Sequence, residues 1–137
     1  MSNSLNRELR PLLEPAHRRR LILEGIELFN TGRYYECHEA WETVWRSTTP
    51  EPRDLFQGLI QVGVGLYHHH DRGRPDVAHR VLGKGQRRLE TLASPCLGLD
   101  LEHLLRHVVA WRRWLASPDG DPPPAPRVRV VHPRALC

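Results

Sequence analysis

Apolar residues recur every three or four positions along most of this chain, the spacing of amphipathic α-helices. Over residues 16–30 the apolar face consists of Leu21, Ile22, Gly25, Ile26 and Phe29. The Asn-Thr-Gly run at residues 30–32 follows. Glycine adopts the left-handed conformation of a helix C-cap without steric cost. The pattern therefore predicts a first helix that ends at about residue 30.

The same spacing predicts a second helix over residues 33–47 and a third that ends near residue 70. Inward positions of the second are Tyr34, Cys37, Trp41, Val44 and Trp45. Those of the third are Leu55, Leu59, Val62, Gly63 and Leu66. Between the two helices, residues 49–52 read Thr-Pro-Glu-Pro, typical of an N-cap followed by prolines in a first turn.

A fourth helix is predicted over residues 75–92, and a fifth after an N-cap at Asp100. The fourth separates its residue types cleanly. Its apolar side carries Val77, Val81, Leu82, Leu89 and Leu92, and its basic side carries Arg80, Lys84, Arg87 and Arg88. After Ser117 the chain becomes rich in proline and poor in core residues.

Short connections between helices favour antiparallel neighbours, so we expect an all-α, single-domain bundle of about five helices. Residues 1–117 are predicted to form this domain. Residues 118–137 are predicted to form a Pro-rich tail that is mobile, although the alternating residues 127–131 would also suit a short strand or a docked segment.

Composition narrows the class of protein. The 137 residues include 26% charged and 39% hydrophobic residues, as in ordinary globular domains. The first twenty residues hold five arginines and no apolar segment of a secretory signal, and no run approaches the roughly 18–20 apolar residues of a membrane span. We therefore expect a cytoplasmic protein without membrane insertion. The net charge of +4 permits anionic partners without requiring them.

Two long motifs identify a family. The chain reads Phe29-x-x-Gly32-x-Tyr34-Tyr35-Glu36-x-His38-Glu39-x-x-Glu42-x-x-Trp45-Arg46, then Phe56-Gln57-Gly58-Leu59-Ile60-Gln61, with His68 further on. Over about residues 20–92 this resembles the bacterial family known as domain of unknown function 309. The resemblance implies a small all-helical protein and selects positions without assigning them a reaction.

The first candidate site lies in the second helix. His38 and Glu42 are four residues apart, and Glu39 lies beside them, so all three project from one helix face. His38 and Glu42 could hold a divalent metal ion, with Glu39 as a further ligand or a base. The alternative is a hydrogen-bonded cluster that only positions the helix.

The second candidate set is Gln57, Gln61 and His68, which share a stripe of the third helix. Glutamine amides can hold a carboxylate or an imidazole in place. We therefore expect the two polar sets to face each other across a seam, as a pocket for a small ligand or a metal. The glycines of the third helix are expected to pack against Trp41 or Trp45.

Other histidines and Cys37 are weaker candidates. The run His68-His69-His70 cannot converge on one ion, because successive helix residues point about 100° apart. His103 and His107 are spaced for a shared metal but lack a third ligand nearby in the sequence. Cys37 lies on the apolar face, which argues against a nucleophile.

Three functions stay open. The chain either binds a ligand or metal between its second and third helices, or is an enzyme, or is a scaffold acting through a surface or a homo-oligomer interface. The enzyme would be a metal-assisted hydrolase with Glu39 or Glu42 as base. The alternative for the surface is nucleic-acid binding through Arg80, Lys84, Arg87 and Arg88 of the fourth helix.

Overall fold

The computed structural model describes residues 13–47 and 53–136. These residues form α2 (Pro15–Asn30), α3 (Tyr34–Arg46), α4 (Arg53–His70), α5 (Pro75–Glu90), α6 (Leu101–Ala116) and the short 3-10 helix η1 (Pro133–Leu136). All five predicted α-helices are therefore present, and the described ranges contain no β-strand beyond isolated bridges. The all-α prediction is confirmed. The cap predicted at residues 49–52 lies outside the described residues.

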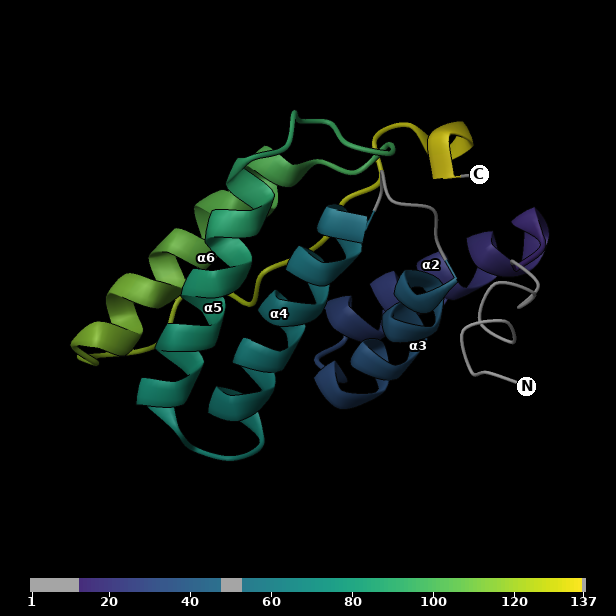
Figure 1. Cartoon of the computed structure of the whole chain (residues 1–137). Coiled ribbons are helices and arrows are strands. Elements are labelled where there is room, and N and C mark those ends of the chain that lie inside the picture. The colour runs from purple at the N-terminus through teal and green to yellow at the C-terminus, as the bar shows by residue number, and fades with distance from the viewer. Residues whose placement is uncertain (1–12, 48–52, 137) are drawn as a thin grey trace, which may run out of the picture.

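Helix α4 occupies the middle of the bundle (Figure 1). It packs most extensively against α5, which in turn packs against α6, while α3 contacts α4 from the other side and α2 packs on α3. The core between these helices is apolar, with Trp41, Phe29 and Phe56 among its largest fully buried side chains. Each of these four pairs consists of consecutive helices, as short connections predict.

Glycines bring α4 and α5 into close contact. A methyl group added to Gly58 would lie 2.6 Å from Leu89, and one added to Gly65 would lie 2.7 Å from Leu82. From the α5 side, a Cβ on Gly85 would approach the carbonyl oxygen of Gly58 to 3.0 Å. These contacts leave no room for a side chain at the α4–α5 seam.

The expected partners of these glycines were therefore wrong. Neither tryptophan packs on them: Trp41 instead covers Gly25 of α2, where an added Cβ would lie 2.1 Å from its Nε1. That indole N–H donates to the carbonyl of Ile22 at 3.3 Å. Periodicity placed the glycines on an inward face but could not say which neighbouring helix they met.

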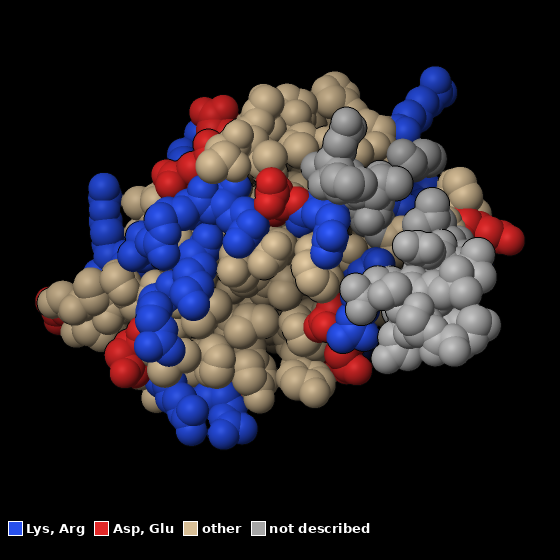
Figure 2. Space-filling view, viewed as in Figure 1, with Lys and Arg blue, Asp and Glu red and all other residues tan. Residues whose placement is uncertain are grey.

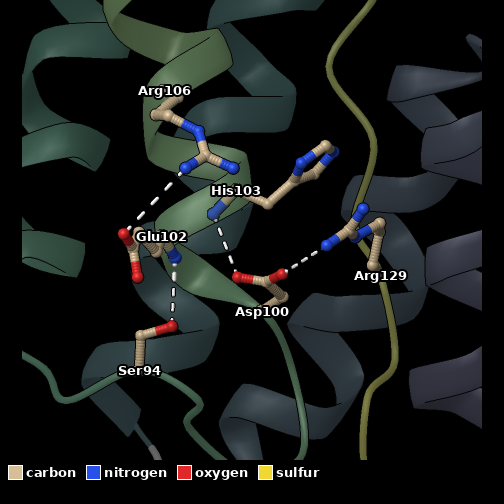
Figure 3. A network of polar contacts seen from close by, with 6 residues as sticks. All are labelled: Ser94, Asp100, Glu102, His103, Arg106 and Arg129. Carbon is tan, nitrogen blue, oxygen red and sulfur yellow. Dashed lines mark hydrogen bonds and ion pairs between the residues drawn. The ribbon is translucent and has the colours of Figure 1, made fainter.

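The N-cap predicted for α6 is present. The Asp100 carboxylate accepts a hydrogen bond from the His103 backbone N–H at 3.0 Å. Its second oxygen accepts from the Arg129 guanidinium at 2.8 Å (Figure 3). These two hydrogen bonds, the His103 one first, hold the pKa of Asp100 below its usual range. The start of α6 is thus tied to the segment that follows it by 29 residues in sequence.

The Pro-rich segment after Ser117 lies along the helices (Figure 1). The Trp111 indole donates to the Pro124 carbonyl at 2.9 Å. The side-chain amide of Asn30 on α2 exchanges two hydrogen bonds with the backbone of Val128, at 2.8 and 3.0 Å. Val128 is 3% exposed and Leu136 is fully buried. The segment therefore connects the two ends of the bundle, α6 and α2.

These contacts match the docked segment that the alternating residues 127–131 also allowed. They weigh against a mobile tail, which the composition favoured because prolines form no regular element. Composition says nothing of the partners that an extended backbone finds. The domain boundary at Ser117 stays a prediction, and a truncation tests it.

Candidate functional site

The polar residues of α3 pair within their own helix. Nε2 of His38 lies 2.8 Å from Oε2 of Glu42, and the Arg46 guanidinium donates to the other Glu42 oxygen at 2.5 Å. Glu39 is exposed, and with Glu42, Thr43 and Arg46 it lines a shallow hollow of about 270 Å³. Both Glu42 oxygens are thus already engaged by residues one turn away on either side.

The polar residues of α4 turn to different neighbours. Gln61 accepts a hydrogen bond through Oε1 from Nε of Arg88 on α5, at 3.3 Å. The His68 ring lies beside Tyr67, with 5.5 Å between centroids, and its Nδ1 is buried with no hydrogen-bond partner among the described residues. Gln57 is half-buried on the same helix.

Within the described ranges, no hydrogen bond or ion pair joins His38, Glu39 or Glu42 to Gln57, Gln61 or His68. Aromatic rings occupy the space between the two sets. Tyr35 of α3 lies 6.4 Å from the His38 ring and 5.7 Å from the Tyr67 ring, centroid to centroid.

We expected the pairing because a buried or half-buried carboxylate needs a partner, but the half-buried Glu42 finds its partners within α3. The side chains of His38 and Glu42 are 33% and 28% exposed, so water reaches them and no amide from α4 is required. The assignment of the six residues to one ligand site stays a prediction without support from a shared contact.

The described residues contain no group of three or more His, Cys, Asp and Glu side chains placed to hold a metal ion. His38 and Glu42 supply two donors that already contact each other. The rings of His103 and His107 are 4.6 Å apart but gain no third ligand. A divalent metal therefore stays a prediction here.

The other chemistry-bearing residues of the motif region are engaged in packing. His69 lies against Trp111 and Trp114, with ring centroids 5.0 and 5.4 Å away, and His70 against Tyr34 at 5.8 Å. The histidine run thus diverges, as helix geometry predicts. Cys37 is fully buried, and burial raises the pKa of its thiol, which disfavours the reactive thiolate.

A polar hollow lies at the α4–α5 seam. Its volume is about 580 Å³, and it is lined by Asp54, Gln61, Lys84, Arg87, Arg88 and Thr91. Arg88 is 34% exposed and held in place, because it donates to Asp54 at 3.0 Å as well as to Gln61. Lys84 and Arg87 are exposed, and no carboxylate of the described residues pairs with either of them.

Basic side chains form a continuous band over α5, and it extends toward the turn between α4 and α5 (Figure 2). We call Arg80, Lys84, Arg87 and Arg88 the basic band. At its far end, the pKa of His68 is lowered by burial first and then by the charges of Arg74, Arg72 and Arg80. The positive field therefore reaches the end of α4.

Sequence reasoning found the basic band but missed two residues of its hollow, Asp54 and Thr91. It also assigned Gln61 to the wrong neighbour. Asp54 and Arg88 are 34 residues apart, and no periodicity links them.

None of the helices in the described ranges combines the length and the apolar composition of a membrane span.

Two comparisons place the chain among known proteins. Residues 22–81 match the family model described as Domain of unknown function (DUF309). Uncharacterized protein YpuF of Bacillus subtilis (strain 168) is 39% identical over 83 residues, which are 58% of this chain and 47% of YpuF. The chain thus spans about half the length of that curated relative. Both findings confirm the resemblance that the two motifs carry.

Proposed function

We propose that the protein binds the phosphate backbone of a nucleic acid along α5. Residues 22–81 match the DUF309 family model. Neither the family description nor the name of the relative assigns a reaction, so the proposal rests on the site. The observation that supports it most is the hollow at the α4–α5 seam, where Lys84, Arg87 and Arg88 gather.

The band suits a polymer better than a single small anion. Arg80 and Arg88 are eight residues apart, which is about 12 Å along a helix at 1.5 Å per residue. Successive phosphates of one DNA strand advance by about 3.4 Å along the helix axis. The band therefore spans several phosphates, and its hollow is an open groove rather than an enclosed cavity.

Arg88 has a special position in the band. Its contacts with Gln61 and Asp54 hold the guanidinium in the lining of the groove, so it loses less side-chain freedom on binding than a free arginine would. Asp54 carries the opposing charge and is 59% exposed, so it can turn away when a phosphate enters. Lys84 and Arg87 supply the exposed charges above.

The ligand or metal pocket between α3 and α4 has less support. Its six residues divide between two clusters, and Glu42 is engaged on both oxygens. The metal-assisted hydrolase lacks a third donor in the part of the chain that the structure describes. Both stay predictions, and neither is favoured by a specific contact.

The test is the salt dependence of binding, measured by fluorescence anisotropy of labelled 12-nucleotide strands and 12-base-pair duplexes. Four phosphate contacts predict a log–log slope of about −3 to −4 for duplex and about −3 for a single strand. The triple variant Arg80→Gln, Lys84→Gln, Arg87→Gln leaves Arg88 in place. Its salt dependence should be less steep, with a slope of about −1.

The control variant removes two charges where the triple variant removes three. It changes Arg106→Gln and Arg113→Gln, which are exposed arginines of α6 outside the band. It removes charge without touching the groove and should leave the slope unchanged. No binding of either probe at 20 mM salt contradicts the proposal. If the control variant weakens nucleic-acid binding as much as the triple variant does, the binding is a non-specific attraction by net charge and the basic band is not its site.

A further inference from the structure

An aromatic platform lies beside the positive end of the bundle. Tyr35 is 53% exposed although it is a large hydrophobic side chain. Its ring lies 5.7 Å from Tyr67 and 6.4 Å from His38, and Tyr67 lies 5.5 Å from His68. We call these four residues the aromatic platform. Two are contributed by α3 and two by α4.

The turn after α4 brings charge to this platform. The backbone N–H of Asp71 donates to the Tyr67 carbonyl at 2.8 Å, and that of Arg74 to the His68 carbonyl at 2.9 Å. The turn therefore folds back onto the last turn of α4. It carries Arg72 and Arg74, both exposed, and is followed by Arg80 of the basic band.

The nearby acidic residues are partly neutralised. Glu36, next to Tyr35, pairs with Arg33 at 2.7 Å. Glu42 pairs with Arg46 and contacts His38. Asp71 contacts His70. Glu39 is exposed. The pKa of His68, a platform residue, is lowered by burial first and then by the charges of Arg74, Arg72 and Arg80, so a polyanion that follows α5 meets positive charge at the α4 side of the platform.

We propose that the nucleic acid bound along α5 is single-stranded, and that one of its bases stacks on the exposed ring of Tyr35. This inference rests on the proposed function and names its substrate class. Aromatic side chains beside a basic groove are the usual means of binding single strands, because every base offers a face for stacking. In a duplex the faces are covered by neighbouring base pairs, so the platform adds nothing to duplex binding.

The experiment compares Tyr35→Ala with Tyr35→Phe, using labelled 12-nucleotide thymidine and adenosine strands and a 12-base-pair duplex. Stacking of one base contributes about 1–3 kcal/mol, so Tyr35→Ala should weaken single-strand binding by about fivefold or more. Tyr35→Phe keeps the ring and should bind within about twofold of the wild type. The salt slope should not change in either variant, because no phosphate contact is removed.

Each outcome separates the two proposals. Weaker single-strand binding by Tyr35→Ala alone, with duplex binding unchanged, supports the platform. If the triple basic variant weakens binding and flattens its salt dependence while Tyr35→Ala has no effect, the proposed function stands and the platform is overturned. Duplex binding as tight as single-strand binding also overturns it. No binding of any probe overturns both. Circular dichroism and thermal unfolding confirm that each variant is folded.

Discussion

The polar cluster of α3 and the polar groove at the α4–α5 seam are made from the same kinds of side chain but join different spans of chain. In α3, Glu42 contacts His38 and Arg46, each four residues away. In the groove, Arg88 contacts Gln61 and Asp54, which are 27 and 34 residues away.

The contacts of the α3 cluster require only the geometry of one helix. Those of the groove form only because α4 and α5 pack together. Exposed pairs within one helix contribute about 0.3–0.5 kcal/mol each. Contacts that join distant segments depend on the whole fold and are lost with it. We therefore expect stability, and the geometry of the basic band, to depend on the long-range contacts and little on the α3 cluster.

The largest effect is expected from removing residues 118–137. The truncated chain loses two buried apolar side chains, Val128 and Leu136, and the two hydrogen bonds of Asn30. Burial of each such side chain contributes about 1.5–3 kcal/mol, so losing both should lower the free energy of unfolding by up to about 6 kcal/mol. Urea denaturation followed by tryptophan fluorescence measures it.

Two valines of this segment provide a matched control. Val128 is 3% exposed and Val131 is 42% exposed. Val128→Ala should cost about 1–2 kcal/mol, and Val131→Ala less than about 0.5 kcal/mol. A truncated protein as stable as the full chain would instead restore the mobile tail and the domain boundary at Ser117.

Two glycines of α4 face different neighbours, Gly65 the helix α5 and Gly63 the helix α3. An alanine Cβ at Gly65 would lie 2.7 Å from the Leu82 side chain and 3.0 Å from its backbone nitrogen, whereas at Gly63 the nearest neighbour is Cys37 Sγ at 3.7 Å. Gly65→Ala should therefore destabilise by about 1–3 kcal/mol through overpacking. Gly63→Ala should stabilise by up to about 1 kcal/mol through helix propensity.

Thermal and urea unfolding of the two variants give the comparison directly. Gly65→Ala should also weaken binding by the basic band, because it pushes α5 away from α4 and separates Arg88 from Gln61. Equal stabilisation by both alanines would show that the α4–α5 seam has room to spare, contrary to the contacts described above.

The smallest effect concerns the polar pairs themselves. A double-mutant cycle of Gln61→Ala and Arg88→Ala should give a coupling of about 0.5–1 kcal/mol, since the hydrogen bond is half-buried and one partner is charged. The cycle of Glu42→Ala and Arg46→Ala should give about 0.3–0.5 kcal/mol and decrease as salt is added. A larger coupling in the α3 pair would reverse the comparison.

Much of the fold could be predicted because its signals are local. The stop after Asn30, the cap at Asp100 and the divergence of His68, His69 and His70 each follow from the geometry of one helix and its ends. The basic band was predicted for the same reason, since its four residues lie on one helix.

The partners of these elements were not determined by local sequence. Periodicity shows that Gln61 borders an apolar face, but only the packing of α4 on α5 decides that it meets Arg88 instead of Glu42. Glu42 is 28% exposed and contacts His38 and Arg46 of its own helix, so it needs no partner from α4.

By itself, the sequence determined the five helices, the resemblance to the DUF309 family and the face that carries the positive charge, because each depends on residues close together in the chain. Only the tertiary structure decided that glycines pack α4 on α5, that the segment after Ser117 contacts both α6 and α2, and that the ring of Tyr35 on α3 lies against Tyr67 on α4. Contacts between distant residues depend on the closeness of approach of whole helices, and side-chain shape sets that closeness in three dimensions.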